Sequence, residues 1–206
     1  MLTDAARDAE TLLVVLHAAL PEHAALPAAW PRCAALWPHA VHLAPLHGHS
    51  PLDPARLRRL WDRIATYLQY GPALYSQATN LIERALALSR EALGDEHPAT
   101  TLPSMNNLAE ALKAQGDLAG ARKLHEQTLA MRRRVLGEEH PKTSISAWNL
   151  FAALLQAEDA EAASGVLHEH LLWLAESDPA GLGGDQREIR RRVRKLTGLD
   201  DGESSS

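Results

Sequence analysis

The sequence contains one cysteine, few aromatic residues and no long apolar run. A single thiol, Cys33, cannot form an internal disulfide, so a reducing compartment suits the chain best. No apolar run approaches the roughly 18 residues that a membrane-spanning helix needs. The short run at residues 12–16 follows acidic residues, where a secretory signal would carry basic ones. The sequence therefore predicts a cytoplasmic protein with no membrane partner.

The sequence also lacks a large excess of charge of either sign. Its formal net charge is −5. This balance gives no reason to expect nucleic acid as a partner. The basic run at residues 190–192 has no interleaved aromatic side chains that could stack on bases. Asp185 and Glu188 and the acidic tail lie nearby, so we interpret the run as the solvated face of a helix.

Catalytic and metal-binding motifs are missing as well. The sequence holds no Gly-x-Ser-x-Gly and no His-Glu-x-x-His pattern. Four histidines, His39, His42, His47 and His49, lie close together, but no carboxylate or cysteine completes a familiar zinc spacing. We therefore predict a protein that is not an enzyme and that carries no metal and no cofactor.

What the chain does have is an internal repeat. The string Leu-Gly-Asp-Glu-His-Pro at residues 93–98 recurs as Leu-Gly-Glu-Glu-His-Pro at residues 136–141. Asn-Leu pairs follow each string at residues 107–108 and 149–150, with one extra residue in the first copy. We place this extra residue at Pro103. The two strings begin 43 residues apart, and repeats with periods of about 20–50 residues are typical of stacked supersecondary units.

Each unit has the pattern of two helices. Met105, Leu108 and Leu112 lie three or four positions apart and would form one apolar face of a first helix. Gly116 can end that helix in a left-handed conformation, and Asp117 can cap the next one. The pattern predicts a helical hairpin in each unit.

A third copy precedes these two, with Trp61, Ile64, Ala65 and Leu68 in its first helix. With this copy the chain resembles tetratricopeptide repeat proteins of the kinesin-light-chain-like subclass. The resemblance implies an all-α fold, a right-handed α-solenoid of antiparallel helical hairpins with about three repeat units. We place the repeats in residues 51–176, as three units: residues 51–93, 98–135 and 141–176.

The two ends lie outside the repeats. Residues 1–50 are predicted to form a helical adaptor, residues 183–197 a capping helix, and residues 198–206 a disordered tail. The string Trp-Pro-Arg-Cys-Ala-Ala-Leu-Trp-Pro-His at residues 30–39 resembles a segment of large bacterial signalling proteins. There, an NTPase domain of the STAND or NB-ARC kind precedes such repeats, which implies an NTPase domain as a partner in cis or in trans. The chain has no phosphate-binding Gly-x-x-x-x-Gly-Lys-Ser/Thr loop of its own.

A binding groove is expected along the first helices, which line the concave side of such stacks. Seven side chains flank the packing positions there: Arg59, Arg63, Asn106, Asn107, Lys113, Trp148 and Asn149. The resemblance implies that asparagine and basic residues at these places hold an extended peptide. The alternative is that they bond within the stack, the asparagines between helices and the tryptophan against a neighbour.

The sequence therefore predicts a scaffold that binds a protein or peptide ligand. The alternative function is a sensor or regulatory arm of a STAND-type ATPase, acting by self-association or inhibition. The identity of the ligand and the oligomeric state stay open.

Overall fold

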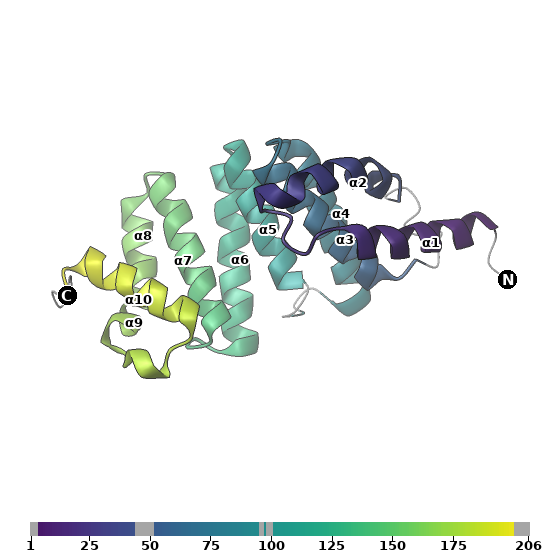
Figure 1. Cartoon of the computed structure of the whole chain (residues 1–206). Helices are drawn as coiled ribbons and strands as arrows, with labels where there is room; N and C mark the ends of the chain where they lie inside the picture. Colours follow the sequence, from purple (N-terminus) through teal and green to yellow (C-terminus); the bar gives the residue numbers. More distant parts are fainter. Residues whose placement is uncertain (1–3, 44–51, 95–96, 98–100, 200–206) are drawn as a thin grey trace. The chain divides into compact units, whose positions relative to one another are not determined.

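The computed structural model describes residues 4–43, 52–94, 97 and 101–199. In these residues the regular structure is helical throughout, without a strand (Figure 1). The predicted all-α class is confirmed. His47, His49 and most of the predicted tail, residues 200–206, lie outside the described residues.

The chain divides into two compact units, Met1–Gly116 and Asp117–Ser206. The helices of the first unit are α1 (Asp4–Ala19), the short η1 (Pro27–Ala29), α2 (Trp30–His42), α3 (Pro54–Tyr70), α4 (Tyr75–Leu93) and α5 (Thr101–Gln115). The helices of the second are α6 (Leu118–Leu136), α7 (Pro141–Gln156), α8 (Ala160–Val166), the π-helical η3 (Leu167–Leu171), α9 (Leu172–Glu176), the short η4 (Pro179–Gly181) and α10 (Gly184–Thr197).

Helix α3 is the centre of the first unit. It forms a hairpin with α4, while α5 packs on α4, and both α1 and α2 pack on α3. The residues of the repeat pattern, Trp61, Ile64, Ala65 and Leu68, are completely buried in α3. Burying large side chains of this kind contributes about 1.5–3 kcal/mol each. The apolar face that the sequence predicts is therefore the face that holds this unit together.

The N-terminal segment is helical, as predicted. Helix α1 ends just before Pro21, and α2 begins with Pro31 in its first turn, where the missing N–H costs no hydrogen bond. Helix α2 continues through Pro38, although proline removes one hydrogen bond there. Cys33 is fully buried on this helix, and burial raises the pKa of its thiol. This is the inert, packed cysteine that its apolar context indicates.

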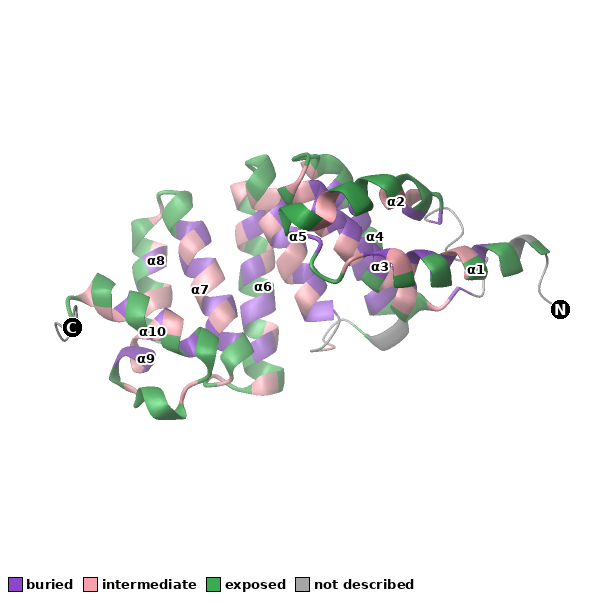
Figure 2. Ribbon diagram, in the orientation of Figure 1, coloured by how far each residue is buried: buried purple, intermediate pink, exposed green. Residues whose placement is uncertain are grey.

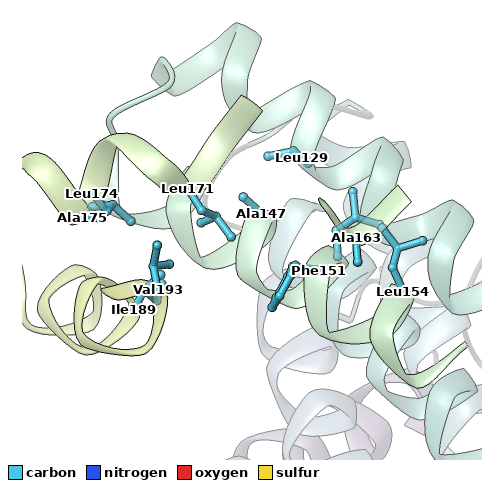
Figure 3. Close-up of a cluster of buried hydrophobic side chains, with 11 residues drawn as sticks. Leu129, Ala147, Phe151, Leu154, Ala163, Leu171, Leu174, Ala175, Ile189 and Val193 are labelled. Carbon is cyan, nitrogen blue, oxygen red and sulfur yellow. The ribbon is translucent and has the colours of Figure 1, made fainter. Parts of the chain in front are cut away.

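In the second unit a hydrophobic cluster joins α6–α10. Helices α6 and α7 form a hairpin, and α8, η3 and α9 run on as one interrupted helix beside α7. The cluster consists of Leu129, Ala147, Leu150, Phe151, Leu154, Ala163, Leu171, Leu174, Ala175, Ile189 and Val193 (Figure 3). Ile189 and Val193 supply the apolar stripe of α10, whose other faces are largely exposed (Figure 2). Helix α10 therefore packs on this unit in the way that a capping helix requires.

The helix ends depend on glycine. Gly94 and Gly137 follow α4 and α6 with φ of 86° and 91° and with extended ψ, a conformation that is essentially restricted to glycine. Gly116 ends α5 with φ of 88°, and Asp117 then accepts a hydrogen bond of 2.9 Å from the Gly120 N–H at the start of α6. The predicted helix end at Gly116 and the predicted cap at Asp117 are confirmed.

The extra residue of the earlier repeat copy is not at Pro103. The Thr101 hydroxyl donates to the Gly94 carbonyl at 2.8 Å, and the Thr143 hydroxyl makes the same 2.8 Å bond to Gly137. These two bonds align the threonines, and from each of them to its asparagine the spacing is equal. The extra residue therefore precedes Thr101, and Pro103 belongs to the regular first turn of α5. The predicted limits of the three repeats stay a prediction.

Candidate functional site

The candidate residues of α5 form a polar stripe. Asn106, Asn107, Glu110 and Lys113 are half-buried and lie three or four positions apart, or side by side, on this helix. Lys113 pairs with Glu110, and Asn106 is engaged within the chain. Asn107 is different, because no described residue is a hydrogen-bond partner of its amide. An unpaired, half-exposed amide can offer both a donor and an acceptor to a bound main chain.

Arg63 is engaged with α1. Its guanidinium donates to the main-chain carbonyls of His17, at 3.3 Å, and Leu20, at 3.1 Å. The last carbonyls of a helix lack partners within the helix, and a cation at this end is favourable. Arg63 therefore holds the C-terminal end of α1, which is what the packing alternative expects of it. Arg59, one turn earlier on α3, is exposed.

Two titratable groups of the first unit have shifted pKa values. Burial lowers the pKa of His17, and Arg63, Arg59 and Arg56 lower it further. Burial raises the pKa of Asp62 from 3.8 to about 6, against the opposing effect of Arg58. Arg58 pairs with one Asp62 oxygen at 2.5 Å, while the other oxygen is buried without a hydrogen-bond partner. The burial of His17 and of Asp62 is therefore electrostatically costly.

In the second unit, the candidate Trp148 contacts its own unit. Its ring lies 5.3 Å from that of Phe151, between centroids, and the guanidinium carbon of Arg192 lies 5.5 Å from its centroid. A cation–π contact of this kind is worth about 0.5–1 kcal/mol at an exposed site. Asn149 is half-buried and also engaged within the chain. Trp148 thus fixes α10 on α7, as the packing alternative expects.

The basic helix α10 uses its arginines to cap α9. The Arg190 side chain donates to the Ser177 carbonyl at 3.0 Å, and that of Arg194 donates to the Ala175 carbonyl at 2.8 Å. Arg192 bonds to Glu188 at 2.8 Å, and Arg191 bonds to Glu188 as well. The predicted charge balance through Glu188 is confirmed. The capping of α9 was not predicted, because it depends on how the chain folds back at residues 177–183.

A polar cluster around the π-helix was also missed. The His170 ring Nδ1 lies 2.9 Å from Glu138, and its Nε2 lies 3.5 Å from Glu169. Arg133 bridges the same two glutamates, at 2.5 Å and 3.3 Å. The string His-Glu-His at residues 168–170 was the only sequence feature that pointed here. It gave no sign of the π-helix that turns His170 toward Glu138.

The described residues contain no group of three or more His, Cys, Asp or Glu side chains that could hold a metal ion. Among the described helices, none combines the length and the apolar character that crossing a membrane requires.

Comparison with known proteins identifies the repeats. Residues 74–99 and 101–142 match the family model described as tetratricopeptide repeat. These residues are therefore similar to tetratricopeptide repeats. Such repeats generally mediate protein–protein interaction, and the fold is typically non-catalytic. No curated protein matches the chain in sequence.

Solved structures show the same fold. A protein from Podosopora anserina, described as a kinesin light chain with nearly identical TPR-like repeats, has a TM-score of 0.62 at 18% identity, over 94% of this chain and 87% of that chain. A variant of the same protein scores 0.63 at 18% identity, over 94% and 86%. BtubC (BKLC) from P. vanneervenii scores 0.58 at 17% identity, over 96% and 94%. At these identities the likeness concerns the fold alone. It does not test the resemblance of residues 30–39 to NTPase-linked proteins, which stays a prediction.

Proposed function

We propose that this chain is a protein-binding module that captures a segment of another protein on the first helices of its repeats. The family match supports an interaction role in general. One observation supports the choice of surface, which is the polar stripe of α5, where the Asn107 amide has no hydrogen-bond partner among the described residues.

The candidate residues contribute unequally to this proposal. Arg63, Lys113 and Trp148 already have partners within their own units. A ligand that used them would have to replace these contacts, at a cost that reduces its affinity. Asn107 and the exposed Arg59 need no such exchange. We therefore assign the main-chain contact to Asn107 and an acidic side chain of the ligand to Arg59.

Calorimetry tests this assignment. A partner would first be isolated by pull-down from the source organism, and its binding segment mapped to a peptide. We expect Asn107→Ala to weaken binding of that peptide about three- to tenfold, since a hydrogen bond contributes about 0.5–1.5 kcal/mol. The control is Gln127→Ala, which removes an exposed amide from the second helix α6. If Asn107→Ala and Gln127→Ala both bind like the wild type, the stripe of α5 is not the binding surface.

A further inference from the structure

An open cleft separates α2 from α4 in the first unit. Its volume is about 430 Å³, and it is lined by Trp37 and Val41 of α2, Leu68 of α3, and Ser76, Gln77, Asn80 and Leu81 of α4. The volume lies within the range of about 300–1,000 Å³ that is typical of binding pockets. Helices that pack in a core normally interdigitate without voids. Here α2 packs on α3, and the space beside α4 is left open.

The floor and one wall of the cleft are apolar. Leu68 and Leu81 are buried beneath it, with exposed fractions of 0% and 3%. Trp37 and Val41, one helical turn apart on α2, are half-exposed beside it. A half-exposed tryptophan beside an apolar hollow is the type of residue that dominates the energy of protein interfaces.

The other rim is polar but uncharged. Ser76, Gln77 and Asn80 are exposed on the first two turns of α4. Gln77 and Asn80 are three positions apart, so their side chains are neighbours on one helical face, about 5–6 Å apart at Cβ. Each amide can donate and accept a hydrogen bond. Among the described residues, none of those that line the cleft carries an ionisable side chain.

This lining defines the chemistry of an occupant. A charged group would lose its hydration against Leu68 and Leu81 with no counter-charge to replace it. Two neighbouring amides can serve a peptide main chain in an extended segment, whereas a helix has already used its own main-chain groups. The neutral rim and the apolar floor therefore match an uncharged extended peptide better than an acidic peptide or a basic one.

We propose that this cleft binds an uncharged, extended segment of a partner protein. A bulky apolar side chain enters beside Trp37, and Gln77 and Asn80 hold the main chain. The site differs from the stripe of α5, and it also differs from the α1-facing side of α3. Leu68 follows Arg63 by five positions, which places the two side chains about 140° apart around α3. The proposal rests on the proposed function only for the class of partner.

Methyl NMR of the full chain with defined probes tests the site directly. The probe is a capped Gly-Leu-Leu-Gly peptide, and capped Gly-Asp-Asp-Gly and Gly-Lys-Lys-Gly peptides are its charged counterparts. We expect the leucine peptide to shift the methyl resonances of Val41, Leu68 and Leu81 in a saturable way. The charged peptides should leave these resonances unchanged. If the charged peptides shift them as strongly, or if no peptide shifts them, the proposal is wrong.

A pair of near-isosteric substitutions tests the rim. The variant Gln77→Glu with Asn80→Asp removes the amide donors and adds charge without changing the size of either side chain. It should weaken the leucine peptide about fivefold or more, because two hydrogen bonds are lost. Gln127→Glu, at an exposed position of α6, is the matched control and should bind like the wild type. Equal affinity of both variants would overturn the assigned role of the rim.

Two further measurements separate the possible failures. The first measurement uses hexanol as a small apolar probe. If hexanol shifts the methyl resonances and the leucine peptide does not, the cleft binds small apolar ligands and the proposal is wrong. The Asn107→Ala variant should bind the leucine peptide like the wild type. If the leucine peptide does not bind in the cleft, the proposal for α5 therefore still stands. If Asn107 proves unimportant for partner binding, the proposal for the cleft still stands.

Discussion

Two residues of the first unit, Asp62 and His17, have pKa values that are shifted in opposite directions. Asp62 is a largely buried carboxylate whose pKa is raised to about 6 by burial, while the buried environment and three arginines lower the pKa of His17. A raised carboxylate pKa favours the folded state at low pH, and a lowered histidine pKa disfavours it there. The two effects oppose each other at low pH, so only substitutions can separate them.

We predict that Asp62→Asn changes the pH dependence of stability. The contribution of Asp62 is fully present below its unfolded pKa of about 3.8 and is lost as the pH rises through about 6. The free energy of unfolding of the wild type, relative to the variant, should therefore fall by roughly 3 kcal/mol between about pH 3 and pH 7. Urea unfolding across this range measures it. Parallel profiles would show that Asp62 titrates like an ordinary carboxyl. The Arg58 ion pair forms only with the ionised carboxylate, and its effect is already included in the Asp62 pKa of about 6.

At the scale of elements, the helix ends define the hairpins. We predict that Gly137→Ala destabilises the protein by about 1–3 kcal/mol, because its φ of 91° with extended ψ is strained for alanine. Open space surrounds the position, so the effect is one of backbone strain alone. Gly165→Ala is the matched control, since it lies inside α8, also in open space and without a positive φ. It should stabilise by about 0.5–1 kcal/mol. Thermal or urea unfolding measures the change in stability of each variant. If both variants change in the same direction, the prediction is contradicted.

The elements also show how far the sequence predicts this structure. Gly116 predicted where α5 ends, because a left-handed glycine at a helix end is a local requirement. The apolar periodicity around Trp61 predicted the buried face for the same local reason. The π-helix at Leu167–Leu171 was not predictable, since its neighbours Arg133 and Glu138 come from another helix and the following loop.

The candidate site was less predictable than the fold. Arg63 and Trp148 were expected at a groove on the basis of their positions in the repeat. Their actual contacts, with the end of α1 and with Arg192 of α10, come from segments outside the repeat pattern. Sequence spacing describes one hairpin at a time, so it could not show which side chains the flanking helices engage. The cleft beside Trp37 was missed for this reason too.

At the scale of the whole molecule, the account has one central claim, that this chain binds a protein partner through the polar stripe of α5. Site-specific photocrosslinking in the source organism tests this claim most directly. A photoreactive phenylalanine would be placed at position 107 in one variant and at position 127 in another, and cross-linked peptides would be identified by mass spectrometry. The account predicts cross-links to one recurring segment of a single partner from position 107, and none to that segment from position 127. Cross-links to that segment from position 127 but not from position 107 would contradict it.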